Sequence, residues 1–255
     1  HPPTSPLSPP SPPLGIRYAA RSERGLVRKT NQDTAYAGSR LLAVADGYGA
    51  EGAPASAAAI EAMKPLPDVP GLPDLPSLPG LPGLPGGELL SALADSVERA
   101  NRAVDGFTGS GTTLTAMLWT GSQLALVHIG DSRAYLLRDG EFFQITHDHT
   151  VVQSMIDEGT LTPEEAASHP QRAILLKALD GTAAQPDLHL QDAHPGDRYL
   201  LCSDGLSTTL PPTRLHDTLT RADTPTEAVD HLITQTHESG APDNIACVVA
   251  DVVPL

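Results

Sequence analysis

The amino-acid sequence predicts one globular domain of the α+β class. Short apolar runs bounded by Gly, Asp and Ser are typical of buried strands, and longer stretches with apolar residues every three or four positions are typical of amphipathic helices. The helical patterns are grouped instead of following each strand, so a regular alternation of parallel strands and helices is not expected. The chain has 255 residues, enough for one domain with a sizeable core.

Several apolar segments are predicted to be strands, and some are apolar on both faces, as in a sheet that is covered on both sides. In chain order these segments are 41–45, 111–119, 123–137, 199–202 and 245–253. After the third segment, Arg138-Asp139-Gly140 supplies the residues of a tight turn, which predicts a hairpin.

Two kinds of pattern predict helices: apolar residues that line up on one helical face, and capping residues typical of a helix N-terminus. Residues 88–104 carry one apolar stripe, made of Leu89, Leu90, Leu93, Val97, Ala100 and Val104. Thr224-Pro225-Thr226-Glu227 combines an N-cap Thr, a first-turn Pro and a reciprocating Glu, and Thr162-Pro163-Glu164-Glu165 repeats that pattern.

Two proline-rich segments stand apart from these patterns. Residues 1–13 lack the apolar content to fold and are predicted to be a tail, so the domain covers 14–255. Residues 64–87 form a Pro/Leu/Gly-rich insert in which proline recurs every third residue from Pro67 to Pro85. Such a segment in the polyproline II conformation would be either a docking strip for a partner or a semi-rigid spacer between two helices.

Charge and composition exclude some partners. The chain has 16 Lys and Arg against 31 Asp and Glu, a net charge of -15. Nucleic acid and anionic membranes need a basic face, so neither is expected as a main partner. No apolar run approaches the roughly 18 residues of a membrane span, and no signal-like start is visible. Cys202 and Cys247 are too few for a disulfide framework and are interpreted as reduced thiols of a cytoplasmic protein.

Aspartates recur at the ends of the predicted strands. They are Asp46, Asp131, Asp204 and, just before the last strand, Asp243. Carboxylates that meet at one rim repel each other unless cations neutralise them, and oxygen ligands favour Mg²⁺ or Mn²⁺ over zinc. Upstream lies Arg28, whose guanidinium can hold phosphate oxygens with two parallel hydrogen bonds.

Eight segments, in order along almost all of residues 16–253, resemble the bacterial metal-dependent protein phosphatases of type 2C. They are RGLVRKTNQD (24–33), AVADGYG (43–49), GSGTTLTAML (109–118), LVHIGDSRAYLLRDG (126–140), ITHDHTVVQSMIDEG (145–159), HPQRAILLKALDG (169–181), GDRYLLCSDGLS (196–207) and APDNIACVVADV (241–252). The resemblance implies a four-layer sandwich of two antiparallel β-sheets flanked by α-helices, with a metal site in a cleft at one end of the sheets.

The resemblance also implies roles for individual residues. The implied metal ligands are Asp46, which would bridge two ions, the Gly47 carbonyl, Asp204 and Asp243, with Asp131 and Asp204 available to a third, weaker ion. The implied catalytic groups are Asp46, Arg28 on the substrate phosphate, and Asp33, which would support the water molecules on the metals. Residues from about 147 to 181 correspond to a flap beside the site.

The implied function is hydrolysis of phosphoserine and phosphothreonine on proteins, opposing Ser/Thr protein kinases. Two Mn²⁺ or Mg²⁺ ions would lower the pKa of a shared water and yield a hydroxide that attacks phosphorus in line. The expected partners are phosphorylated proteins and, with them, Ser/Thr kinases of the same cell, and the expected oligomeric state is a monomer.

One departure from the family pattern supports an alternative. After the first Asp the bacterial pattern is commonly Asp-Gly-Met-Gly-Gly-His, whereas this chain has Asp46-Gly47-Tyr48-Gly49-Ala50-Glu51. The histidine proposed to protonate the leaving group is therefore missing. Glu51 would replace it if burial raised its pKa, or solvent would suffice. The alternative function is a catalytically weak regulatory module that binds phosphoproteins.

The remaining notable side chains are expected to be structural. His128 lies within a predicted strand and is interpreted as a core histidine with satisfied hydrogen bonds. His147 and His149 belong to the start of the flap and are not expected to bind metal. Cys202 has no Cys-x5-Arg loop around it and is interpreted as a core thiol.

Overall fold

The computed structural model describes residues 12–65 and 86–255. The predicted proline-rich tail and insert lie outside the described residues except at their edges, so both remain predictions. Within the described ranges, none of the helices combines the length and the apolar character needed to cross a membrane.

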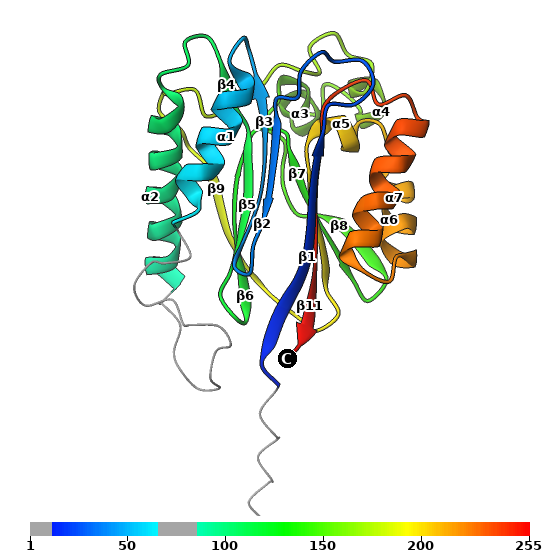
Figure 1. Cartoon of the computed structure of the whole chain (residues 1–255). Helices are drawn as coiled ribbons and strands as arrows, with labels where there is room; N and C mark the ends of the chain where they lie inside the picture. Colours follow the sequence, from blue (N-terminus) through cyan, green and yellow to red (C-terminus); the bar gives the residue numbers. More distant parts are fainter. Residues whose placement is uncertain (1–11, 66–85) are drawn as a thin grey trace, which may run out of the picture.

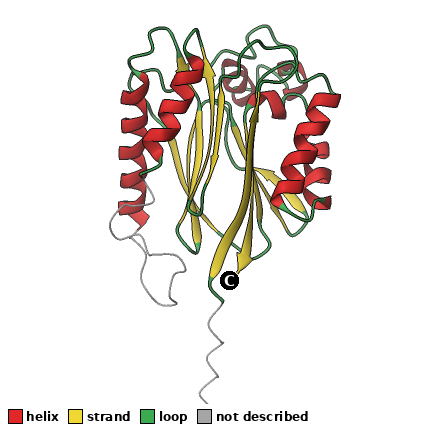
Figure 2. Cartoon of the chain, viewed as in Figure 1, coloured by secondary structure: helices red, strands yellow, loops and turns green. Residues whose placement is uncertain are grey.

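Two antiparallel sheets form the centre of the molecule (Figures 1 and 2). The first has the order β1-β11-β10-β7-β8, with strands Leu14–Glu23, Ile245–Pro254, Arg198–Cys202, Arg133–Arg138 and Glu141–Gln144. The second has the order β2-β3-β5-β6-β9, with strands Asp33–Ala37, Leu41–Tyr48, Leu114–Trp119, Gln123–Ile129 and Asp187–Asp192. The short β4 (Gly111–Thr112) pairs with β3.

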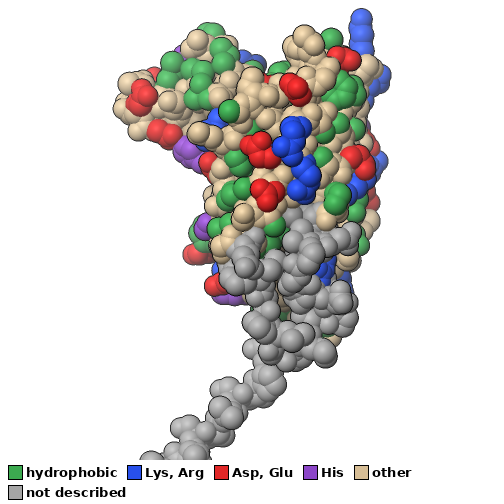
Figure 3. Space-filling view, turned by 90° about the vertical axis from the view of Figure 1, so that its left-hand side faces the viewer, with side chains coloured by type: hydrophobic (Ala, Val, Ile, Leu, Met, Phe, Trp, Pro, Cys, Tyr) green, Lys and Arg blue, Asp and Glu red, His purple; other side chains and the backbone are tan. Residues whose placement is uncertain are grey.

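Helices cover the outer face of each sheet, so the molecule has the four predicted layers. In Figure 1, α1 (Gly52–Met63) and α2 (Gly86–Val104) lie outside the second sheet. Helices α6 (Pro212–Arg221) and α7 (Pro225–Glu238) lie outside the first. Three short helices stand at the upper end of Figure 1: α3 (Val151–Asp157), α4 (Pro163–Ala166) and α5 (Asp204–Ser207). On the side of the molecule where α1 and α2 lie, acidic and basic side chains are interspersed over the surface (Figure 3).

The layering explains why the sequences of several central strands are apolar on both faces. In β3, Leu42 and Val44 point into the layer between the two sheets, whereas Leu41, Ala43 and Ala45 point toward α1 and α2. Because side chains alternate along a strand, a strand covered on both faces needs an unbroken apolar run. A third apolar cluster fills the space between the first sheet and helices α5, α6 and α7.

The predicted starts of α4 and α7 and the hairpin are confirmed, but Glu227 accepts from the Asp223 N–H (2.9 Å) and not from the N–H of the N-cap residue Thr224. The Thr224 side chain caps α7, Thr162 and Glu165 form a capping box at α4, and β7 and β8 are joined at Asp139-Gly140. The segment 123–137, by contrast, divides at residues 130–132 into β6 and β7, which join different sheets. Gly130 has a φ of +109° there, a backbone conformation that a residue with a side chain rarely adopts.

Candidate active site

The carboxylates predicted as site residues lie at strand ends and in the adjoining connections and helix start, at one end of the two sheets, the upper end of Figure 1. Asp46, near the end of β3, is the direct cross-strand neighbour of Asp33 at the start of β2. The Asp46 backbone N–H donates to the Thr113 hydroxyl (2.9 Å), and the Thr113 N–H donates to the Asp46 carbonyl (2.9 Å). The two carboxylates are therefore held side by side by the ladder of the second sheet.

Gly47 follows Asp46 where the backbone is crowded. A Cβ atom on Gly47 would lie 2.0 Å from the Gly52 carbonyl oxygen and 2.7 Å from the Gln32 carbonyl oxygen. The Gly47 N–H donates to that Gln32 carbonyl (3.1 Å). Only glycine fits this close approach, so the start of α1 and the loop before β2 are packed directly against the end of β3.

Asp33 links the two sheets. Its Oδ2 atom accepts a hydrogen bond of 2.6 Å from the hydroxyl of Ser203, which follows β10 in the first sheet. The Ser203 hydroxyl in turn accepts from the Ala246 N–H (2.9 Å) on β11. The other carboxylate oxygen, Oδ1, is buried and has no hydrogen-bond partner among the described residues. Asp33 therefore offers one free oxygen at the meeting point of the sheets.

Asp131 lies in the turn between β6 and β7. The adjacent Ser132 hydroxyl forms a hydrogen bond of 2.7 Å with the Thr113 hydroxyl, so Thr113 contacts the backbone of Asp46 and the neighbour of Asp131. Arg133 forms a bidentate ion pair with Asp148, with donor–acceptor distances of 3.0 and 2.6 Å. This ion pair fastens the turn that carries Asp131 to the start of the flap.

Asp204 is the first residue of α5, and Asp243 lies in the connection from α7 to β11. The backbone brings these segments into contact at Gly205, where an added Cβ would lie 1.9 Å from the Asn244 carbonyl oxygen. The Arg28 Nη2 atom donates to Asp243 Oδ2 at 2.7 Å, and the Arg28 side chain remains 56% exposed. A substrate phosphate could therefore reach this guanidinium.

Asn244 holds the loop that carries Arg28. Its side-chain oxygen accepts from the Gln32 N–H (2.9 Å), and its amide group donates to the carbonyls of Arg24 (2.9 Å) and Thr30 (2.8 Å). The sequence reasoning did not single out Asn244, Ser203 or Thr113. All three lie inside the quoted motifs, but nothing in their residue type or spacing distinguishes a positioning residue from an ordinary polar one.

Burial, and after it the neighbouring carboxylates, raise the pKa values of the aspartates in the site. Burial raises the pKa of Asp33 to about 7, assisted by the charges of Asp204 and Asp243 and opposed by the Ser203 hydrogen bond. Burial and Asp204 likewise raise the pKa of Asp131 to about 8. The pKa values of Asp46 and Asp204 are also raised, chiefly by burial. This cluster concentrates negative charge that a cation would offset.

The residues present fit a hard divalent cation. The available donors are carboxylate and carbonyl oxygens, the ligands that Mg²⁺ and Mn²⁺ prefer, and Asp33 adds a buried oxygen without a partner. Within residues 12–65 and 86–255, no three Asp, Glu, His or Cys side chains already converge as in a formed metal site. The ligand assignments from the sequence therefore remain proposals.

The flap is fastened to the site by short pairings. Thr112 of β4 bridges Leu179, and Thr150 bridges Leu175. The His149 Nδ1 atom accepts from the Gly130 N–H (3.1 Å), and its Nε2 atom lies 3.0 Å from Asp187 Oδ2. The hydrogen bond between Gly130 and His149 is one residue from Asp131, so the position of the flap and the position of this aspartate depend on each other.

Two side chains follow Asp46 closely along the chain, Tyr48 and Glu51, and Glu51 was considered as a replacement acid. Glu51 is exposed at the N-cap of α1 and its side chain makes no capping hydrogen bond, so it lacks the burial that a replacement acid would need. Tyr48 is 37% exposed, and its hydroxyl lies 2.4 Å from where a Cβ on Gly111 would be. Tyr48 therefore packs over β4 and also borders the site.

The core interpretations of His128 and Cys202 are confirmed. His128 is 1% exposed; its Nε2 donates to the His147 carbonyl (2.9 Å), and its Nδ1 lies 2.9 Å from the Thr115 hydroxyl. Cys202 is buried with a free thiol.

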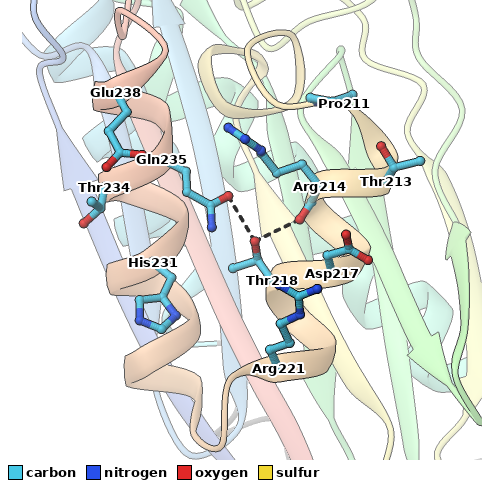
Figure 4. A pocket seen from close by; sticks show the side chains of 10 residues that line it. All are labelled: Pro211, Thr213, Arg214, Asp217, Thr218, Arg221, His231, Thr234, Gln235 and Glu238. Carbon is cyan, nitrogen blue, oxygen red and sulfur yellow. Dashed lines mark hydrogen bonds between the residues drawn. The ribbon is translucent and has the colours of Figure 1, made fainter.

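A separate groove of about 700 Å³ lies between α6 and α7 (Figure 4). The Thr218 hydroxyl donates to the Arg214 carbonyl (2.8 Å) and lies 3.0 Å from the side-chain oxygen of Gln235, which joins the two helices. Asp217 and Glu238 line the groove beside Arg214 and Arg221, so its charge is mixed. None of the predicted site residues lies there, and the groove is not the candidate active site.

A comparison with known protein families identifies the family to which this chain belongs. The model of the family described as protein phosphatase 2C matches residues 27–248. The chain belongs to the protein phosphatase 2C family. This confirms the resemblance inferred from the eight motifs, and the two-sheet sandwich is the fold of its solved relatives.

Relatives within the protein phosphatase 2C family show how far the likeness extends. The chain is 48% identical over 247 residues to the serine/threonine protein phosphatase PstP of Mycobacterium tuberculosis, covering 94% of this chain and 46% of PstP. A crystal structure of the M. tuberculosis PstP/Ppp phosphatase superposes with a TM-score of 0.84 at 46% identity, covering 94% of this chain and 99% of that one. The PstP catalytic domain in complex with two manganese ions gives 0.82 at 45% identity, with the same coverage. The chain thus spans about half the length of this curated relative.

Proposed function

We propose that this chain hydrolyses phosphoserine and phosphothreonine on proteins and so opposes Ser/Thr protein kinases. The observation that carries the proposal is the grouping of Asp33, Asp46 and Asp204 beside the exposed guanidinium of Arg28, in a member of the protein phosphatase 2C family. Relatives that carry the name serine/threonine phosphatase support it.

We assign the metal ligands to Asp46, the Gly47 carbonyl, Asp204 and Asp243, with Asp131 and Asp204 for a further ion. The relative solved with two manganese ions supports a site for two Mn²⁺ or Mg²⁺ ions. When bound, such ions would activate water for attack on phosphorus and offset the charge of the phosphate. At Gly47 and at Gly205, which follow Asp46 and Asp204, the backbone is packed too closely for any side chain.

The other residues of the site bind the phosphate and handle protons. Arg28 would exchange part of its hydrogen bonding with Asp243 for the phosphate oxygens, where a guanidinium can bond in a bidentate way. The free Oδ1 atom of Asp33 can accept a hydrogen bond from water, while Ser203 keeps the carboxylate oriented. Protonation of the leaving group is left to solvent, because Glu51 is exposed.

The test measures phosphate release from a phosphothreonine peptide with Mn²⁺, with EDTA, and with the Asp204→Asn variant. We expect turnover that requires Mn²⁺ and collapses in Asp204→Asn. The matched control is Asp217→Asn, an exposed aspartate in the α6–α7 groove, which should keep wild-type turnover. No turnover in a folded protein that still binds Mn²⁺ would favour the alternative, a module that binds phosphoproteins; the missing histidine is the observation behind that alternative.

The cellular setting is part of the same proposal. We propose that the protein acts in the cytoplasm as a monomer on phosphoproteins, with kinases of the same cell producing its substrates. The two free buried cysteines support the cytoplasmic part of this proposal.

A further inference from the structure

Two cysteines face each other across the strands β10 and β11. Cys202 lies directly opposite Cys247 in the register, both side chains are fully buried, and both thiols are free. The next pair along the ladder, Ser203 and Ala246, is hydrogen-bonded, with the Ser203 N–H donating to the Ala246 carbonyl at 3.0 Å. Because hydrogen-bonded and non-hydrogen-bonded pairs alternate in an antiparallel ladder, the cysteines occupy a non-hydrogen-bonded position.

This position brings the two side chains within reach of a covalent bond. The Cα atoms of a non-hydrogen-bonded pair are about 4.5 Å apart, and a disulfide spans Cα separations of roughly 4.4–6.8 Å. Opposite residues also project to the same face of the sheet, and both thiols belong to the apolar cluster between the first sheet and helices α5, α6 and α7. Only a small shift of the two strands is needed to bring the sulfur atoms together.

We propose that Cys202 and Cys247 form a reversible cross-strand disulfide, so that this pair is a site of oxidative modification by peroxides. Each thiol loses its hydrogen and one S–S bond forms. One molecule of hydrogen peroxide accepts the two electrons and the two protons and becomes two molecules of water. A dithiol reductant reverses the reaction by thiol–disulfide exchange.

The modification would act on the candidate active site. Cys202 precedes Ser203, whose hydroxyl donates to Asp33, and Cys247 follows Ala246, whose N–H donates to that same hydroxyl. A disulfide holds its Cβ atoms about 3.8 Å apart, whereas opposite residues of a non-hydrogen-bonded pair have Cβ atoms near the short end of about 4.5–5.5 Å. Closing the bond therefore draws the strands together one rung from Ser203 and displaces its hydrogen bond to Asp33. This effect on catalysis rests on the proposed function.

The first experiment tests the bond itself without depending on access to the buried thiols. The reduced chain is unfolded and refolded in a mixture of reduced and oxidised glutathione, remaining thiols are alkylated, and the intact mass is measured without reductant. We expect a folded product that is lighter by two hydrogen atoms than the unmodified reduced chain, takes up no alkylating agent and yields a Cys202–Cys247 cross-linked peptide. A folded product that keeps two alkylatable thiols, or carries only glutathione adducts, would overturn the proposal.

The second experiment tests the coupling to catalysis with the Cys247→Val variant, which preserves the apolar environment and cannot form the bond. Peroxide is expected to lower the turnover of the wild type several-fold, with recovery in dithiothreitol, and to leave Cys247→Val unaffected. Equal inhibition of both proteins, or full activity of the cross-linked wild type, would refute the coupling. A wild type that forms the disulfide but is inactive in both redox states would refute the phosphatase proposal and leave the modification site standing.

Discussion

Several residues of the site occupy positions where the backbone leaves no space for a side chain. At Gly205 a methyl group would meet the Asn244 carbonyl at 1.9 Å, so Gly205→Ala has to move either α5 or the start of β11. We expect it to lower the free energy of unfolding by about 1–3 kcal/mol, as overpacking does, and to reduce turnover because Asp204 and Asp243 separate. Urea denaturation and phosphate release measure the two effects. Gly106→Ala, with open space around the added methyl, should change neither.

His128 makes the stability of the fold depend on pH. Burial, together with the neighbouring His149, lowers the pKa of His128 to about 4 from its usual 6.5. Between these values the unfolded chain binds a proton that the folded protein excludes, so this contribution to stability is complete above about pH 6.5 and is lost as the pH falls to about 4. The loss amounts to roughly 3 kcal/mol.

Denaturation of wild type and His128→Gln at several pH values checks this prediction. The variant is expected to lose stability less steeply than the wild type across that window. His189→Gln, at an exposed position on β9, serves as the control and should follow the wild type. Parallel curves for His128→Gln and the wild type would contradict the assignment.

Among the connecting elements, the loop from β1 to β2 forms three hydrogen bonds with one side chain, that of Asn244. Asn244→Ala removes three hydrogen bonds to the backbone of this loop, at a position that is 5% exposed. We expect a loss of about 2–4 kcal/mol in the free energy of unfolding, since each buried bond contributes about 1 kcal/mol and unpaired groups add to the cost. The KM for a phosphopeptide should also rise, because Arg28 is carried by the same loop.

A helix cap remote from the site provides the control for Asn244→Ala. Thr224→Ala removes the hydrogen bond to the Glu227 N–H and should cost about 1 kcal/mol without changing KM. A rise in KM for both variants would mean that general destabilisation, and not the position of the Arg28 loop, is responsible.

The sequence was most informative for elements with strong local signals. The cap at Thr224, the capping box at Thr162 and the central apolar strands were predictable because periodicity and turn chemistry act over a few residues. Strands β1, β2 and β9 were not singled out, because their partly exposed residues lack an unbroken apolar run. The division at 130–132 was also missed, since both halves are apolar and only the turn glycine separates them.

For the molecule as a whole, the pairing of strands into two sheets came from the resemblance and not from periodicity. Local patterns contain no information on which distant strands become neighbours. The same holds for the site: four aspartates at strand ends could be named, but the bridge from Asp33 to Ser203 and the pair between Arg28 and Asp243 join residues 170 and 215 positions apart. Such contacts follow only from the assembled fold.

The overall charge leads to a prediction about substrates. At a net charge of -15 the protein attracts cations and repels anions over distances of about 10 Å at moderate salt. We expect phosphopeptides with basic flanking residues to show a lower KM than acidic ones of equal length, with the difference shrinking as ionic strength rises. Steady-state kinetics at two salt concentrations measure this, with a neutral peptide as reference. An unchanged ratio at high salt would point to specific contacts.

The antiparallel pairing of β1 and β11 determines how the domain responds to mechanical force. Leu14 pairs with Pro254 and Glu23 with Ile245, so β1 begins and β11 ends at the same end of the first sheet. In Figure 1 this is the lower end, opposite the end at which the candidate site lies. Tension applied between Pro13 and Leu255 would load the rung at Leu14 first and then each following rung in turn. The strands would therefore unzip one hydrogen bond at a time instead of shearing together, and the domain would yield to pulling at low force.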